Sequence, residues 1–102
     1  MSISGAMNTA VSGMLAQTTR LSAAASNLAN IDTPDYTRLN ASTTSMSGGV
    51  AATVTQSADN SNVNMATEML DLIGAKIEFQ ANAKVLEAGA DMWEMLSLIK
   101  RD

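Results

Sequence analysis

The chain has 102 residues and a net charge of −4, and it contains neither cysteine nor histidine. This length allows one domain at most, the lack of cysteine excludes disulfides and thiolate metal sites, and the lack of histidine removes the commonest general base and metal ligand. An acidic chain has no dominant electrostatic attraction to nucleic acid or anionic lipid. We therefore expect no enzyme, no cofactor or metal, no small-molecule substrate and no nucleic-acid partner.

The apolar residues are unusual for a small domain. Only Tyr36, Phe79 and Trp93 are aromatic, whereas methionine occurs eight times and alanine is abundant. Small side chains suit close helix-on-helix contact, and methionine suits adaptable contact surfaces. No apolar run approaches the roughly 20 residues of a membrane span. The N-terminus shows no basic segment followed by an apolar one, so we expect neither membrane insertion nor a cleaved signal.

Residues 1–30 form the first predicted segment, an N-terminal core helix that begins near Ile3. Its apolar and small residues recur at alternating spacings of four and three, which is typical of a helix packed along another helix. This seam consists of Ile3, Met7, Ala10, Met14, Gln17, Leu21, Ala24 and Leu28. Arg20 is the only charged residue of the segment, although a solvated helix normally carries a charged face. Most of its circumference can therefore accept a close neighbour.

Residues 31–62 form a connector rich in serine, threonine and glycine. The helix is expected to end near Asn30, because asparagine tolerates the left-handed conformation beyond a helix C-terminus. Thr33-Pro34-Asp35-Tyr36 predicts a turn, with Pro34 presetting φ. The alternation in residues 50–55 makes a short β-hairpin plausible, and the composition fits a flexible surface loop equally well.

Residues 63–102 predict a C-terminal core helix from about residue 65, with Asn64 as its N-cap. One seam at four-three spacing consists of Met65, Met69, Leu72, Lys76, Phe79, Ala83, Leu86, Ala90 and Trp93. A second apolar stripe consists of Ala66, Leu70, Ile73, Ile77, Val85, Met92, Leu96 and Ile99. One partner helix needs one seam, so the second stripe implies a second neighbour. This helix is also expected to overhang the first by several residues.

The clusters that could carry chemistry have simpler explanations. Glu87, Asp91 and Glu94 share one helix face, which is typical of a solvated acidic stripe. Gly48-Gly49 lacks the lysine and the helix that a phosphate loop requires. The position of Trp93 within a seam favours packing over ligand stacking.

The residues around the end of the first helix resemble a known motif. Asn27-Leu28-Ala29-Asn30-Ile31-Asp32-Thr33-Pro34-Asp35-Tyr36-Thr37-Arg38 resembles the N-terminal motif of the bacterial flagellar rod, hook and hook-associated protein family, roughly A-x-N-(I/L)-A-N-x-x-T-P-G-Y-x-R. The matching residues include Asn27, Ala29, Asn30, Thr33, Pro34 and Tyr36. Asp35 stands where the family usually has glycine, and aspartate is one of the few residues that tolerate positive φ.

A second resemblance lies in the C-terminal segment. Asn62-Val63-Asn64, Glu68-Met69, Phe79-Gln80-Ala81-Asn82 and Val85-Leu86 are similar to the family's C-terminal signature. The spelling is most like the proximal rod protein subgroup, and the short connector makes this a minimal member. The resemblance implies paired terminal helices in a tubular assembly.

Taken with the two helical segments, this predicts a mainly α fold: an antiparallel, coiled-coil-like two-helix hairpin whose connector is a short loop or small β-hairpin. The resemblance also implies a structural axial subunit of the flagellar basal body, rod or hook, that polymerises through its terminal helices for motility. It would be exported by the flagellar type III apparatus without a cleaved signal and would contact copies of itself and other axial proteins.

Two sets of residues carry specific expectations. We expect Asn30, Pro34 and Tyr36 to hold the angle at which the chain leaves the first helix. The residues expected to form the helix seam and the assembly surfaces are Ile3, Met7, Met14, Leu21, Leu28, Met69, Leu72, Phe79, Gln80, Asn82, Leu86, Trp93 and Leu96.

Two other functions fit parts of the sequence. A small secreted helical-hairpin effector or carrier fits the length and acidity, but such proteins have a Trp-x-Gly turn, and here Trp93 lies far from the turn and no Trp-x-Gly occurs. A peripheral membrane-binding helix would need a polar face rich in lysine and arginine, which the first helix lacks.

Overall fold

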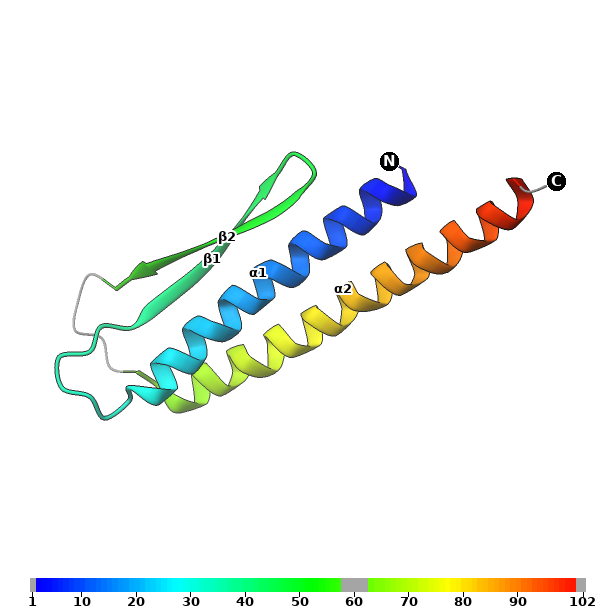
Figure 1. The fold of residues 1–102 in the computed structure, drawn as a ribbon. Helices are drawn as coiled ribbons and strands as arrows, with labels where there is room; N and C mark the ends of the chain where they lie inside the picture. Colours follow the sequence, from blue (N-terminus) through cyan, green and yellow to red (C-terminus); the bar gives the residue numbers. More distant parts are fainter. Residues whose placement is uncertain (1, 58–62, 101–102) are drawn as a thin grey trace.

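The computed structural model describes residues 2–57 and 63–100. Within these ranges the order is α1 (Ile3–Ala29), β1 (Leu39–Met46), β2 (Gly49–Gln56) and α2 (Met65–Lys100). The helices lie antiparallel and side by side, and the strands lie along α1 on the side away from α2 (Figure 1). The molecule is elongated, with extents of 66 × 23 × 14 Å. α1 is therefore the middle layer.

Both helices begin at capping side chains. Ser2 Oγ accepts a hydrogen bond of 3.0 Å from the Gly5 backbone N–H at the start of α1. Asn64 Oδ1 accepts one of 3.2 Å from the Thr67 N–H at the start of α2, which is the predicted N-cap. Each bond satisfies one of the backbone donors that the first turn of a helix leaves unpaired.

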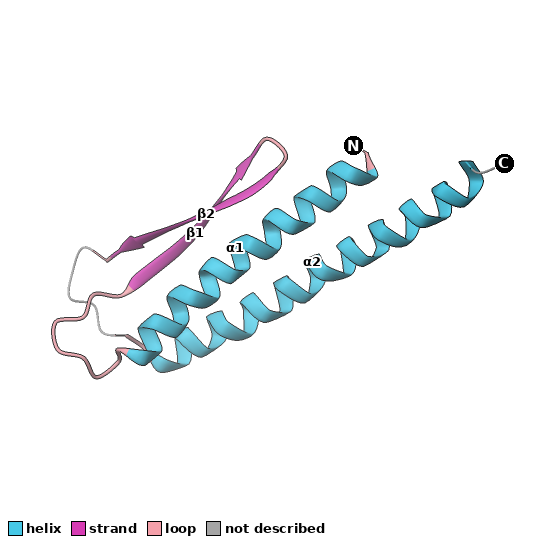
Figure 2. Ribbon diagram, in the orientation of Figure 1, coloured by secondary structure: helices cyan, strands magenta, loops and turns pink. Residues whose placement is uncertain are grey.

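The predicted fold class, mainly α with a short loop or small β-hairpin as connector, is wrong. The connector contains two antiparallel strands of eight residues each, so the fold is helix–strand–strand–helix (Figure 2). The pairing runs from Leu39↔Gln56 to Met46↔Gly49. An isolated two-stranded hairpin is marginal in water, and packing against a helix stabilises it. The docking surface on α1 explains why this segment is a structural layer; composition alone could not show that surface.

The hairpin crosses α1 obliquely. β1 is partly buried at its beginning and exposed toward the tip, whereas β2 is partly buried beside the tip and exposed at its end. At the tip, Thr9 Oγ1 donates to the Gly48 carbonyl over 3.3 Å, and the Val50 N–H donates to Ser12 Oγ over 3.1 Å. Gly48 is the second residue of the two-residue turn and has a positive φ of 85°, which glycine adopts without strain. Hydroxyl groups of α1 thus hold the tip in place.

Small residues form the contact between the helices. Among residues 2–57 and 63–100, the buried apolar side chains are all alanines: Ala10, Ala16, Ala23, Ala24 and Ala75. A Cβ added at Gly13 would come within 2.6 Å of Asn82 Nδ2, and one added at Gly89 within 2.6 Å of Met7 Cγ. The backbones therefore approach closely, and the core is thin. The last turns of α2, residues 90–100, are exposed throughout.

Candidate functional site

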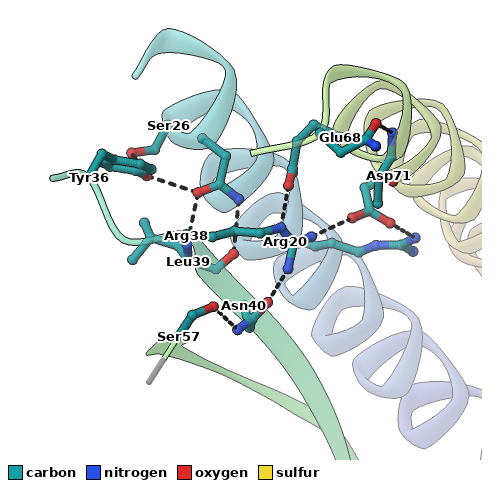
Figure 3. Close-up of polar contacts among 12 residues, drawn as sticks. Arg20, Ser26, Tyr36, Arg38, Leu39, Asn40, Ser57, Glu68 and Asp71 are labelled. Carbon is teal, nitrogen blue, oxygen red and sulfur yellow. Dashed lines mark hydrogen bonds and ion pairs between the residues drawn. The ribbon is translucent and has the colours of Figure 1, made fainter. Parts of the chain in front are cut away.

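The most closely bonded part of the molecule is the junction where α1, the turn and β1 meet (Figure 3). Asn27, only 1% exposed, faces the start of β1. Its Nδ2 donates to the Leu39 carbonyl over 2.9 Å, and its Oδ1 accepts from the Leu39 N–H over 2.8 Å. An amide side chain on α1 thus bonds both backbone groups of one residue, as a neighbouring strand would. This pair sets where the hairpin begins relative to α1.

Tyr36 completes this anchor from the turn. Its hydroxyl donates to Asn27 Oδ1 over 2.8 Å and lies 3.2 Å from Ser26 Oγ. The ring thus lies against the end of α1, as Figure 3 shows, with its polar group bonded to two successive helix residues. Buried tyrosine hydroxyls usually find such partners.

An ion-pair cluster ties all three parts of the chain together. Arg38 Nε donates to Glu68 Oε1 over 2.5 Å, and Arg38 Nη2 lies 3.5 Å from Asp71 Oδ2. Arg20 of α1 lies 3.2 Å from Asp71 Oδ1 and 3.1 Å from Glu78 Oε2. Glu68 is only 1% exposed, so its pairing with Arg38 compensates for the loss of hydration. The connector arginine and the α1 arginine thus share the carboxylate of Asp71, and each pairs with one further glutamate of α2.

Asn40 extends the cluster into the hairpin. Its Oδ1 accepts from Arg38 Nη1, and its Nδ2 donates to Ser57 Oγ over 2.9 Å. The Ser57 N–H in turn donates to the Arg38 carbonyl over 2.9 Å. Both ends of the hairpin are therefore connected to the same arginine.

The turn differs in one respect from the sequence expectation. Asn30 has φ −109° and is not left-handed; its Nδ2 instead bonds the Ser26 carbonyl over 2.9 Å, and its Oδ1 accepts from Thr33 Oγ1 over 3.1 Å. The positive φ, 61°, occurs at Asp35. With Pro34 before it and a Tyr36 N–H to Thr33 carbonyl bond of 3.4 Å, this is the arrangement of a type II turn. Side-chain bonds end the helix, and Asp35 reverses the chain.

The seam residues are only partly brought together. The buried positions of α2, Glu68, Ala75 and Gly89, each directly precede a predicted seam residue. In α1, Gly13, Ala16, Ala23 and Asn27 do the same, whereas the buried Ala10 and Ala24 are predicted seam residues themselves. Within the pair, Ile3 and Met7 meet α2 at Gly89, and Asn82 lies opposite Gly13. Of the remaining predicted residues, Met14, Leu28, Leu72 and Leu86 are half-buried, and Leu21, Met69, Phe79, Gln80, Trp93 and Leu96 are exposed.

An apolar depression lies between the two helices and is lined by no residue of the β-hairpin. It is an open groove of about 690 Å³, and its walls include Leu21 of α1 and Leu72, Ile73 and Phe79 of α2. A smaller polar cavity of about 430 Å³ is lined by Arg38, Glu68 and their partners. In the described residues no group of three or more acidic side chains is arranged to hold a metal ion. Neither described helix has an apolar stretch sufficient to cross a membrane.

Comparison with known families identifies this architecture. A family model of flagella basal body rod proteins matches residues 7–37, which contain most of α1 and the turn. A second family model, the C-terminal part of flagellar basal body rod FlgEFG proteins, matches residues 54–98, which contain nearly all of α2. The chain belongs to the flagellar rod and hook protein family. No match is found among curated proteins.

The rod and hook family assignment makes this chain a structural component of the flagellar basal body rather than an enzyme. It also gives the motif residues a structural setting. Asn27 and Tyr36 form the anchor of β1, while Ala29, Thr33 and Pro34 are exposed around it. Asn82 of the C-terminal motif contacts α1. Asn62 lies outside the described residues.

Sequence reasoning missed the ion-pair cluster of this rod and hook protein. In the sequence, Arg38 and Glu68 stand out as motif residues, Glu68 and Asp71 as acidic residues near the start of the C-terminal helix, and Arg20 as a lone charge. A signal was present, because Arg20 is the single charge of a long helix and such a residue requires a partner if the helix is covered. Asp71 and Glu78 lie seven residues apart on α2, so one arginine can reach both.

Proposed function

We propose that this protein is an axial subunit of the flagellar rod or hook that polymerises through its two helices and thereby supports motility. The observation that carries this proposal is the uncovered apolar surface of α2. Leu70 is 69% exposed and Ile77 is 59% exposed, and Ile73 between them is exposed as well. Burying a leucine or isoleucine side chain gains roughly 1.5–3 kcal/mol. These residues belong to the second apolar stripe of the C-terminal helix, and α1 leaves this stripe uncovered.

The outer face of α1 supports the same conclusion. One stripe of exposed residues recurs there at spacings of four and three and consists of Ser4, Asn8, Val11, Leu15, Thr18, Ser22, Ala25 and Ala29. No charged residue interrupts this stripe. Small and uncharged side chains let another helix approach without the loss of hydrated charges.

The end of α2 provides a third uncovered surface. Residues 90–100 extend beyond the contact with α1, and Met92, Trp93, Leu96 and Ile99 are all exposed there. Apolar surfaces this extensive on a small protein mark interaction sites. A neighbouring subunit would cover them in an assembly.

The partners follow from the family. We propose that copies of this chain and other flagellar axial proteins are the neighbours, that the flagellar export apparatus delivers it without removing a signal, and that it lies in the periplasmic rod or the hook. The Phe79-Gln80-Ala81-Asn82 spelling favours the proximal rod. The family matches speak against the secreted effector or carrier considered from the sequence.

A charge placed on the second apolar stripe of α2 tests this proposal. Leu96→Asp puts a carboxylate where a neighbour would bury an apolar side chain, and it lies beyond the contact with α1. We expect monomer helicity by circular dichroism to stay nearly unchanged, and incorporation into isolated basal bodies and swimming motility to be lost.

Ser97→Asp is the matched control, because it adds the same charge one residue away on the exposed helix. Normal incorporation of Leu96→Asp, or equal loss for Ser97→Asp, would show that the second stripe is not an assembly surface. Cryo-electron microscopy of basal bodies would independently locate the subunit.

A further inference from the structure

The edges of the β-hairpin are chemically unprotected. From Leu39 to Gln56 the sequence has no charged residue and no proline. Natural sheets usually block exposed edges with lysine, proline, bulges or a covering segment, because free N–H and C=O groups pair readily with another strand. The chain as a whole carries a net charge of −4, so this strip is a surface where two copies can meet without charge repulsion.

The register shows which backbone groups point outward. In an antiparallel pair, alternate opposite residues bond each other and the others direct their N–H and C=O groups away. The Ser57 N–H bonds the Arg38 carbonyl, so with the observed register the even-numbered residues of β1 bond inward. The outward residues are therefore Leu39, Ala41, Thr43 and Ser45 in β1, and Val50, Ala52, Val54 and Gln56 in β2. The side-chain bonds to Leu39 and Val50 agree with this assignment.

α1 occupies only part of each edge. Asn27 bonds the outward groups of Leu39, and Ser12 bonds the outward N–H of Val50. Because the hairpin crosses α1 obliquely, Thr43 and Ser45 of β1 and Val54 and Gln56 of β2 lie at exposed positions. One open edge is thus near the tip on the β1 side, and the other is near the base on the β2 side.

We propose that these two open edges pair between successive copies of this chain, so that the hairpins join into a continuous antiparallel sheet. Ser45 of one copy lies opposite Val54 of the next, and Thr43 lies opposite Gln56. In each pair the two residue numbers add up to the same value, so both pairs form in a single antiparallel register between the two copies. Copies in the same orientation present β1 antiparallel to the neighbouring β2, as within one hairpin. The shift is four residues along the strand, roughly 13 Å.

A second copy is the occupant because each copy brings both halves of the contact. The β1 edge of one copy meets the β2 edge of the next, which leaves a new β1 edge free. Such a heterologous contact extends indefinitely unless it closes into a ring. This inference rests on the proposed function, since it supplies a second contact alongside the helix faces. The edge pairing also sets the offset between successive copies along the strand direction, which helix packing alone does not set.

The test uses cysteine pairs, because the natural chain has none. Full-length Ser45→Cys and Val54→Cys variants are mixed at a concentration at which the chain assembles, then oxidised. Opposed residues in a bonded pair have Cα atoms about 5.5 Å apart, which a disulfide can span. We expect a heterodisulfide between the two variants. Thr44→Cys with Val54→Cys is the control, because Thr44 is exposed and its side chain lies on the opposite face of the sheet.

A second pair of variants tests the backbone bonds. Thr43→Pro removes an outward N–H without breaking a bond within the hairpin, and Thr43→Ala keeps that N–H. We expect proline to raise the concentration needed for association roughly tenfold and alanine to leave it nearly unchanged.

The outcomes separate the two proposals. Assemblies that form without the heterodisulfide, that form mainly Ser45→Cys homodimers, or that cross-link equally in the control overturn the edge pairing and leave the helix-mediated assembly standing. Cross-linking of Val54→Cys to a different axial protein in basal bodies overturns the identity of the occupant. A natural chain that remains monomeric at every concentration overturns both.

Discussion

Asn27 shows how one side chain can replace a strand. Its amide bonds both backbone groups of Leu39 and also accepts from Tyr36, and all of this occurs at a position 1% exposed. The geometry requires a group that donates and accepts at a fixed separation, and asparagine has such a group. Aspartate at this position could not donate to the Leu39 carbonyl.

Asn27→Ala is therefore expected to destabilise the chain by about 1–3 kcal/mol, because it leaves the partly buried N–H and C=O groups of Leu39 without these partners. The measurement is the urea midpoint of the full chain followed by circular dichroism. Asn8→Ala, at an exposed position of the same helix, should change it little. A midpoint shift for Asn27→Ala no larger than that of Asn8→Ala would contradict the anchoring role.

Asp35 is the residue-scale exception to the family motif. Its φ of 61° is unfavourable for most residues with a side chain, and glycine adopts it freely. Asp35→Gly is expected to raise the stability by about 0.5–1 kcal/mol, since relief of this strain exceeds the added flexibility of the unfolded chain. Asp32→Gly, in the same exposed loop, should not stabilise. Equal urea midpoints for natural chain and Asp35→Gly would show that the turn carries no strain.

At the scale of elements, the connector is attached to both helices by charge. Arg38 follows the turn and pairs with Glu68 and Asp71 of α2. Arg20 of α1 pairs with the same Asp71 and with Glu78. Hydrogen bonds at the tip and at Asn27 hold the hairpin to α1 alone. Removing the cluster would therefore loosen α2 before it loosens the hairpin.

Arg38→Met should destabilise by about 3 kcal/mol, because it leaves the Glu68 carboxylate buried without its partner. The double variant Arg38→Met with Glu68→Met should recover much of that loss, since no uncompensated charge remains. Urea unfolding of the natural chain, the two single variants and the double variant completes this double-mutant cycle. Additive effects of the two substitutions would mean that the two side chains act independently.

At the scale of the whole molecule, the two long helices bury few large apolar side chains between them. Alanines and glycines fill the contact between α1 and α2, and the large apolar side chains mainly lie on the outside. Ordering each residue costs about 1–2 kcal/mol of backbone entropy, and isolated helices of moderate length are marginal. Helix ends without a partner therefore depend on neighbours.

We predict that the dilute subunit is partly unfolded at its helix ends and becomes fully helical on assembly. Hydrogen exchange should show weak protection in residues 90–100 of the monomer and strong protection in the assembled state, while amides near Asn27 are protected in both. Circular dichroism should show a matching gain in helicity. A dilute monomer with protected amides throughout α2 would refute this coupling and leave the family membership unchanged.

Much of the helical content and the family could be determined from the sequence alone. Four-three spacing, the predicted N-cap Asn64 and the two motifs are local signals that need no knowledge of distant residues. The prediction of an additional neighbour rests on the two apolar stripes of one helix. The site was harder to predict from the sequence, because the bonds of Asn27 to Leu39 and of Arg38 to Glu68 join residues that are distant in the sequence.

The tertiary structure alone decided which face of each helix is buried and what the connector is. One residue rotates a helical position by about 100°, so the same repeat can turn either the large or the small residues toward the partner. Here Gly13, Ala75 and Gly89 face inward, which lets the backbones approach and leaves the larger side chains outside. The connector, ambiguous by composition, became a hairpin because α1 offers Ser12 and Asn27 to its backbone.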